Sequence, residues 1–234
     1  MIRKNIFLPF KFLPVALMLS VTGPAYTQTG SFKASMIKSK EFHKHGQYAR
    51  AAVEGKNAMQ LALKTFGENH PNVASAINNL AFIFHAQGKY DEAETLYRQA
   101  LDIWKTAFRD NHPYIATIFN NMAELYRVQN KLKKAEELYK ASITIIVQNY
   151  GNAHIRLVPS LNNLSELFSQ TGEYQDAIAL SETALKIIRS EQKPDKMRLK
   201  IVLENLADLY AKSGMAKRSK FLRTEALAVH QGDQ

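Results

Sequence analysis

The sequence predicts an all-α fold, a solenoid built from about five stacked helix pairs. Three observations predict it. The chain repeats itself every 42 residues, as the asparagine pairs in "SAINNLAF", "TIFNNMAE" and "PSLNNLSE" show. Each repeat contains two stretches with apolar residues at helical spacing. Finally, two-helix units cannot bury their apolar faces alone, so repeats of this length stack on their neighbours.

The composition is that of a globular protein. Of the 234 residues, 46% are hydrophobic and 22% are charged, which argues against extensive disorder. The chain contains no cysteine. This excludes thiolate metal sites, catalysis by a thiol and a lipid attached to an N-terminal cysteine.

Residues 1–25 are predicted to be a secretory signal peptide. Arg3, Lys4 and Lys11 precede the apolar run "FLPVALMLSV", which is too short to span a bilayer. We therefore expect export, to the periplasm or as a secreted protein, with cleavage near Ala25 or Thr27. The alternative is an N-terminal helix that anchors the chain. Removing residues 1–25 takes away three positive charges and no negative ones, so the formal charge falls from +10 to +7.

The solenoid is predicted over residues 26–234, in units at 31–70, 71–112, 113–154, 155–196 and 197–230. The second unit shows the plan. Asn69 or His70 caps the first helix, and Pro71 lies in its first turn, where a missing N–H does no harm. Gly88 ends that helix, and "YDEAETLYRQALDIWKTAF" forms the second, with acidic residues in its first turn as the helix dipole favours. The units at the two ends are more divergent.

Two further sets of residues keep the same register. The first set tolerates the left-handed backbone found where helices end: Gly46, Gly88, Asn130, Gly172 and Gly214. The second set is small, and we expect it where two helices cross closely: Ala51, Ala93, Ala135 and Ala177, then Ala58, Ala100, Ser142, Ala184 and Ala226.

Across residues 66 to about 214 the sequence resembles a known group, the 42-residue tetratricopeptide repeats of kinesin light chains and their bacterial relatives. The resemblance rests on the text "GENHPNVASAINNLAFIFHAQGKYDEAETLYRQALDIW" and its two successors. Its signature residues are Leu80, Ala81, Phe84, Gly88, Ala93, Tyr97 and Ala100. The resemblance implies a right-handed superhelix of helix-turn-helix units, here of an exported type, with a concave groove that binds a partner.

The resemblance also implies a set of binding residues. In the family, asparagine side chains of the groove hold the backbone of an extended peptide, since an amide both donates and accepts. Carried over to this chain, the asparagine ladder is Asn78, Asn79, Asn120, Asn121, Asn162, Asn163 and Asn205. Residues one or two turns further on join it: Phe82, Glu124, Arg127, Glu166 and Asp208, with His85 and Lys212 beside them. The alternative is that the asparagines bridge adjacent helices with no ligand involved.

The charge of this groove bears on its ligand. The expected groove holds four acidic residues, Glu124, Glu166, Glu204 and Asp208, and two basic ones, Arg127 and Lys212. The kinesin light chain groove, by contrast, is basic and takes acidic peptides. We therefore expect a neutral or mildly basic extended segment as the partner.

Nothing in the sequence indicates catalysis, a metal site or a cofactor. His70, His112 and His154 recur in loops, where capping explains them, and no His-x-x-x-His pair has an acid nearby. Glycine loops that bind phosphate are absent too. Basic residues are spread along the chain rather than gathered in one stripe, so we expect no binding to nucleic acid. Trp104 is expected in the core.

We therefore expect a non-catalytic scaffold that binds a protein or peptide in its groove. Two alternatives remain. One is self-assembly as a homo-oligomer through the last helix, where Phe221, Leu222 and Leu227 are expected to be exposed. The other is weak association with an anionic membrane or surface, which rests on the net charge alone.

Overall fold

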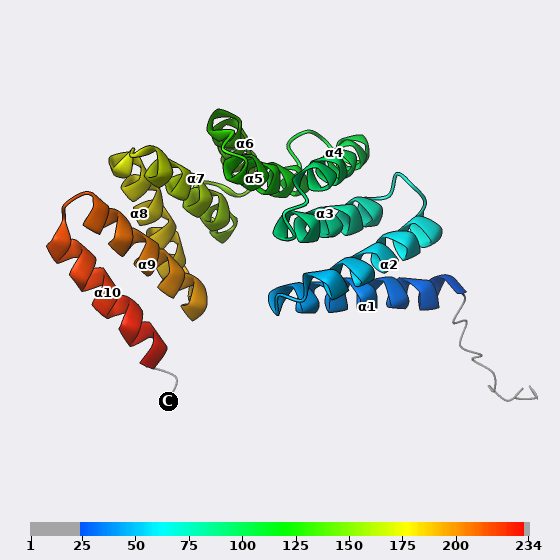
Figure 1. The fold of residues 1–234 in the computed structure, drawn as a ribbon, viewed down its shortest axis with the longest axis horizontal. Coiled ribbons are helices and arrows are strands. Elements are labelled where there is room, and N and C mark those ends of the chain that lie inside the picture. The colour runs from blue at the N-terminus through cyan, green and yellow to red at the C-terminus, as the bar shows by residue number, and fades with distance from the viewer. Residues whose placement is uncertain (1–23, 232–234) are drawn as a thin grey trace, which may run out of the picture.

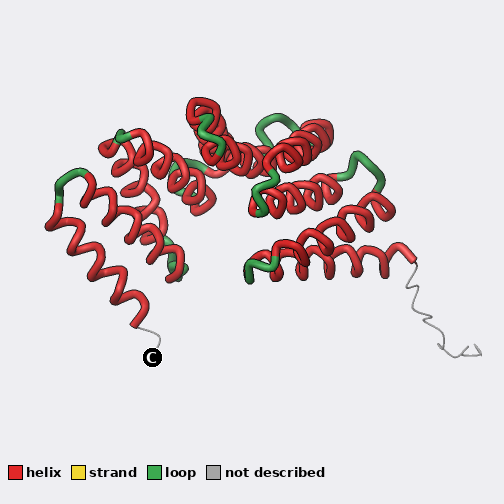
Figure 2. The backbone as a smooth tube through the Cα atoms, viewed as in Figure 1, coloured by secondary structure: helices red, strands yellow, loops and turns green. Residues whose placement is uncertain are grey.

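The computed structural model describes residues 24–231, and these form an arch of helix pairs (Figure 1). Every described element is helical, and short loops join the helices (Figure 2). The all-α solenoid predicted from the sequence is confirmed. The predicted signal peptide, apart from its last two residues, lies outside the described residues. Within residues 24–231, no helix combines the length and the apolar character needed to cross a bilayer.

Each of the five pairs has a first and a second helix. The first helices are α1 (Pro24–Lys44), α3 (Pro71–Ala86), α5 (Pro113–Val128), α7 (Val158–Thr171) and α9 (Lys196–Lys212). The second helices are α2 (Tyr48–Phe66), α4 (Tyr90–Ala107), α6 (Leu132–Tyr150), α8 (Tyr174–Ser190) and α10 (Ala216–Gln231). A short 3₁₀ turn, η1 (Ile155–Leu157), precedes α7.

The predicted N-caps and the predicted left-handed residues at the helix C-termini are confirmed. His70, His112 and His154 each accept a hydrogen bond through Nδ1 from the backbone N–H two residues later, at 3.1 to 3.2 Å. This supplies one of the partners that a helix start lacks. All five residues of the predicted left-handed register have positive φ, including the one non-glycine, Asn130, at 59°.

Small residues pack where the helices cross, as predicted. The nine positions named from the sequence are all buried, from Ala51 with no exposed surface to Ala226 with 2%. The single serine among them, Ser142, donates to the carbonyl of Ala116 at 2.8 Å. Trp104 is buried in the core, and its Nε1–H donates to the carbonyl of Pro71 at 3.3 Å. These crossings let each pair bury its apolar faces against the next.

Contacts between pairs give the array its curvature. The first helices of successive pairs pack on each other, α1 on α3, α3 on α5 and α5 on α7. Within residues 24–231, no second helix packs closely on the next second helix. The first helices therefore follow the shorter arc, and they line the concave side of the arch (Figure 1).

The last helix differs in one respect from its prediction. Phe221 and Leu227 are exposed, at 68% and 64%, but Leu222 is buried at 7%. The expectation that Leu222 is exposed is therefore wrong, because this side chain packs into the core cluster. The apolar surface of α10 is smaller than the sequence suggested.

Candidate functional site

The predicted asparagine ladder lies along the first helices, and its members bind one another. Asn121 Nδ2 donates to Asn78 Oδ1 at 3.1 Å, which joins α5 to α3. One unit further, Asn163 Nδ2 donates to Asn120 Oδ1 at 3.2 Å, which joins α7 to α5. In both bonds the second asparagine of one unit donates to the first asparagine of the unit before it. The ladder therefore has a direction.

At the N-terminal end of the ladder, an asparagine bonds a serine instead of another asparagine. Met36 stands where the first unit would place an asparagine, 42 residues before Asn78. Asn79 is 8% exposed and donates instead to Ser39 Oγ at 2.9 Å. Ser39 in turn donates to the carbonyl of Ala51 at 3.0 Å. The amide of Asn79 is thus held inside the first two units.

At the other end the ladder is broken. Asn162 Oδ1 is buried and has no hydrogen-bond partner among the described residues. Its neighbour in the next unit, Asn205, is exposed on α9. In the described part of the chain, α7 and α9 do not pack closely on each other as the earlier first helices do. An acceptor that the ladder satisfies elsewhere is therefore left open here.

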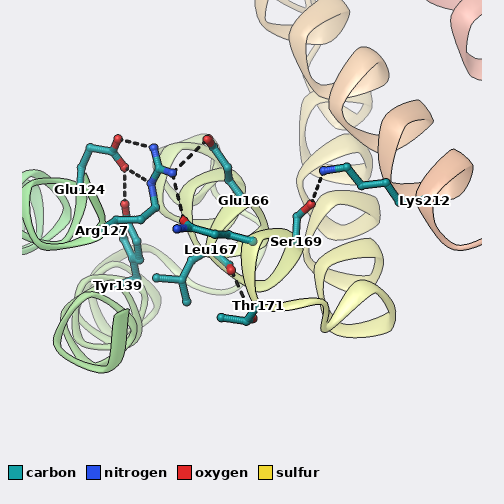
Figure 3. A network of polar contacts seen from close by, with 9 residues as sticks. Glu124, Arg127, Tyr139, Glu166, Leu167, Ser169, Thr171 and Lys212 are labelled. Carbon is teal, nitrogen blue, oxygen red and sulfur yellow. Dashed lines mark hydrogen bonds and ion pairs between the residues drawn. The ribbon is translucent and has the colours of Figure 1, made fainter. Parts of the chain in front are cut away.

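A cleft of about 200 Å³ lies between these two helices at the break. We call it the α7–α9 cleft. Its lining is polar apart from one leucine: Asn162, Ser165, Glu166, Ser169, Asn205, Asp208, Leu209 and Lys212. Lys212 Nζ donates across it to Ser169 Oγ at 2.9 Å (Figure 3). Four of the residues predicted to bind peptide, Asn162, Glu166, Asn205 and Asp208, thus lie in one cleft.

Glu124, Arg127 and Glu166 form a connected charge network, in which the guanidinium of Arg127 lies between the two carboxylates (Figure 3). Arg127 Nη2 and Nε donate to the two oxygens of Glu124 at 2.7 and 2.9 Å. Its Nη1 lies 3.3 Å from Glu166 Oε1 on α7. Tyr139 O–H donates to Glu124 Oε2 at 2.7 Å. The network ties α5 to both α6 and α7.

The pKa values of the network follow from these contacts. Burial alone would raise the pKa of Glu124, but the hydrogen bonds from Arg127 and Tyr139 and the charge of Arg127 outweigh it, and the pKa is lowered. Burial raises the pKa of Tyr139, and its bond to the carboxylate of Glu124 raises it further. Glu124 is therefore the anion of the network, and Tyr139 the neutral donor.

The groove carries more positive charge than the sequence count suggested. Asp208 pairs with Arg223 at 2.7 Å, and Glu204 pairs with Lys200 at 3.8 Å. A second cleft of about 470 Å³, which Asn120 and Asn121 help to line, also holds Arg156 and Arg198. The sequence reasoning missed these four cations because it followed only the asparagines and the positions one or two turns after them, although Arg156 and Arg198 lie 42 residues apart. All four acids of the expected groove have a basic partner.

Phe82 lies in a third cleft, of about 520 Å³, at the N-terminal half of the concave side. Its ring lies 4.6 Å from that of His43, and Tyr114 stacks on Trp104 with 5.1 Å between ring centroids. Asn78, Asn79 and Asn121 line the same cleft. His43 and Tyr114 were not predicted. His43 lies 42 residues before His85, so the repeat register could have found it, whereas the position of Tyr114 holds other residue types in the other units.

Metal binding finds no support in the part of the chain that the structure describes, where no group of three or more His, Asp or Glu side chains could hold an ion. Burial lowers the pKa of His43 and of His85. Both side chains are therefore mainly neutral near pH 7.

Comparison with known proteins gives one family and several similar structures. The family model described as "Tetratricopeptide repeat" matches residues 42–106, 72–146, 114–190 and 156–231. No curated protein sequence matches the chain at a significant level.

Three solved structures illustrate the likeness. BtubC (BKLC) from P. vanneervenii is 20% identical, with a TM-score of 0.70 over 90% of this chain and 92% of that one. A kinesin-light-chain-type protein from Podosopora anserina, with nearly identical TPR-like repeats, is 20% identical, with a TM-score of 0.67 over 91% and 99%. PilF from Pseudomonas aeruginosa is 18% identical, with a TM-score of 0.60 over 86% and 78%. At these identities the likeness concerns the fold.

Proposed function

The chain belongs to the tetratricopeptide repeat family, and from that premise we propose that it is a non-catalytic scaffold which binds an extended segment of a partner protein along its concave side. The fold supports a protein-interaction scaffold in general. What we add is the place of binding. The α7–α9 cleft anchors the partner, and the clefts at Arg156 and Phe82 receive neighbouring side chains.

The observation that carries this proposal is the open acceptor of Asn162. A buried oxygen without a hydrogen bond costs about 1–3 kcal/mol. Nothing in the described part of the chain satisfies it. Asn162 lines the α7–α9 cleft, so a turn of its side chain toward the ligand brings this oxygen to a ligand backbone N–H. The exposed amide of Asn205 is available for the ligand's carbonyl.

The bridged asparagines have a different role in this proposal. Asn121 and Asn163 each use one N–H to hold the neighbouring unit. Each keeps a second N–H and its carbonyl oxygen, which an extended ligand can use. They therefore set the spacing of the first helices and contribute secondary contacts. The strongest dependence on an amide is expected at Asn162 and Asn205.

A random peptide library tests the proposal directly. Twelve-residue peptides displayed on phage are selected against the wild-type protein, and the enriched peptides are measured by fluorescence anisotropy. The double variant Asn162→Ala/Asn205→Ala is expected to lose about tenfold or more in affinity, the equivalent of about 1.4 kcal/mol. Unchanged affinity would show that the cleft is not the anchor.

A matched variant separates binding from stability. Asn121→Ala leaves the oxygen of Asn78 without its donor, so we expect it to lower the free energy of unfolding by about 1 kcal/mol. It is expected to reduce peptide affinity much less than the double variant does. If Asn121→Ala abolishes binding while the double variant does not, the anchor lies in the middle of the ladder instead.

We further propose that the protein is exported and that residues up to Ala25 or Thr27 are removed. Helix α1 begins at Pro24, so cleavage at either position removes at most its first four residues. Mass spectrometry of the protein from the native host tests this. An intact N-terminus on an exported protein would favour the alternative, an anchoring helix.

A further inference from the structure

A large apolar cleft lies on the other side of the array, between the second helices α8 and α10. Its volume is about 760 Å³. Leu185, Leu206, Tyr210 and Leu222 form its floor and are buried. The ring of Phe221 forms one wall and is 68% exposed. We call this surface the α8–α10 groove. It shares no lining residue with the α7–α9 cleft.

The rim of the groove is basic. Four cations line it, Lys186, Arg189, Lys217 and Arg218, against one acid, Glu182. Two of the four are engaged: Arg189 pairs with Glu225 at 2.5 Å, and Arg218 donates to the hydroxyl of Tyr210 at 3.3 Å. Glu182 accepts a hydrogen bond from Tyr210. Lys186 and Lys217 have no ion-pair partner among the described residues.

The last unit departs from its own repeat to make this groove. The position of Phe221 is held by Thr95, Glu137 and Ala179 in the preceding three units. The positions of Lys217 and Arg218, in the first turn of α10, are both acidic in α4, both basic in α6 and hold one acid in α8, so the basic start is shared with α6 and Phe221 is the departure. Positive charge at a helix start opposes the helix dipole, and a ring that is 68% exposed gains little from burial. Phe221 and the charges beside it therefore contribute little to the stability of α10.

We propose that the α8–α10 groove binds an acidic amphipathic helix of a partner protein. The lining residues of α8 extend from Glu182 to Ser190, about 12 Å at 1.5 Å per residue, which matches two turns of a helix. Apolar side chains spaced at i, i+3, i+4 and i+7 fill the floor beside Phe221. Glu or Asp side chains at their flanks pair with Lys186 and Lys217.

Charge disfavours two other occupants. A second copy of this chain docked through the same surface would bring its own basic α10 against the rim, and like charges at close range repel. The N-terminal segment 1–25 of this chain carries Arg3, Lys4 and Lys11 and no acid, so the rim repels it as well. An acidic helix satisfies both the apolar floor and the unpaired lysines.

A designed peptide tests the proposal. The probe is a sixteen-residue helix with leucines on one face and glutamates at its flanks, labelled with fluorescein and titrated with the full-length protein at low salt. We expect saturable binding that weakens with added salt. A version with lysine in place of glutamate, and one with a central proline that breaks the helix, are both expected not to bind.

Variants place the binding on the groove. Lys186→Glu/Lys217→Glu and Phe221→Ser, all at exposed side chains, are each expected to lower the affinity about tenfold or more. The control is Lys105→Glu/Lys133→Glu, which changes the same charge on the neighbouring second helices α4 and α6. It is expected to bind as the wild type does. Asn162→Ala/Asn205→Ala is also expected to bind normally, which separates this groove from the concave side.

Four results would overturn the proposal. The first is the absence of saturable binding, and the second is an equal loss of affinity in the control variant. The third is binding to vesicles that contain phosphatidylglycerol, but not to the peptide, with the same dependence on Lys186 and Lys217. The fourth is a dimer in light scattering that Phe221→Ser dissociates. The third would assign the groove to anionic lipid and the fourth to a second copy of the chain.

Discussion

Two tyrosines 42 residues apart show how one neighbouring residue decides whether a buried hydroxyl group stabilises the fold. Tyr97 and Tyr139 are both buried with no exposed surface. Tyr139 donates to Glu124, whereas the hydroxyl of Tyr97 has no partner among the described residues. The reason lies in the sequence, because Phe82 stands where Glu124 would be one unit earlier.

The first prediction concerns this pair. Tyr139→Phe is expected to lower the free energy of unfolding by about 1.5–3 kcal/mol, since it removes a hydrogen bond to a charged group. Tyr97→Phe is expected to be neutral or stabilising, because it removes a buried hydroxyl that is not paired. Urea unfolding followed by circular dichroism measures both. Equal losses for the two variants would contradict the assignment.

The second prediction concerns pH. The pKa of Glu124 is lowered in the folded protein from its ordinary value of 4.5. Its contribution to stability is therefore complete above pH 4.5 and is lost as the pH falls through the lower, folded-state pKa. The difference in free energy of unfolding between the wild type and Glu124→Gln is expected to be constant from pH 7 to about 5.5 and to shrink below 4.5. A difference that grows on acidification would contradict it.

The sequence predicted which residues lie in the groove better than it predicted their partners. The capping histidines and the left-handed residues were found because each acts on its own backbone, within a few positions. The bond from Asn121 to Asn78 forms because α3 and α5 approach each other closely. The acceptor of Asn162 stays unpaired because α7 and α9 are further apart. Helix separation results from packing over whole units, so repeat register alone does not reveal it.

At the scale of elements, the residue that follows a second helix decides where that helix ends. Helices α2 and α6 contain 19 residues each, while α4 contains 18. Gly67 and Gly151 follow the two longer helices with φ of 81° and 84° and an extended ψ, a region open to glycine almost alone. Arg109 occupies that position after α4. Because arginine does not adopt this conformation, α4 ends one residue earlier, at Ala107.

The third prediction follows from this difference. Gly151→Ala is expected to lower the free energy of unfolding by about 1–3 kcal/mol, through backbone strain alone, since open space surrounds the position. Arg109→Ala, at the equivalent place, is expected to change it by less than about 0.5 kcal/mol. Thermal unfolding of the two variants measures this. If Gly151→Ala matches the wild type, the positive φ imposes no strain on alanine.

At the scale of the whole molecule, one apolar core runs along the array from Phe32 to Ala226 instead of gathering at a centre. Helices contact only their own pair or the adjacent one along residues 24–231, and the first helices touch their counterparts in the next pair as far as α7. Stability is then a sum over units and the interfaces between neighbours. The sequence predicted this organisation from its period alone, whereas the separation of α7 from α9 has no periodic signal.

The fourth prediction tests this organisation. Ala184 on α8 has no exposed surface and belongs to the core cluster. Ala184→Leu overpacks the site and is expected to cost about 1–3 kcal/mol. Hydrogen exchange is expected to accelerate in α7 to α10 and to remain unchanged in α1 to α4. Uniform acceleration over all the helices would show that the molecule opens as one cooperative unit.

In each amide bond of the ladder, a unit donates to the unit before it, and this direction affects how the array can gain a repeat unit. A tandem copy of residues 113–154 brings its own donor, Asn121, for the unit before it and its own acceptor, Asn120, for the unit after it. Duplication in the middle of the chain therefore lengthens the arch and keeps each amide bond of the ladder satisfied. In the last described unit the acceptor position is held by the carboxylate of Glu204, which pairs with Lys200 at 3.8 Å. An internal duplication therefore copies the amide-to-amide bond itself, whereas a unit added after α10 would donate to a carboxylate.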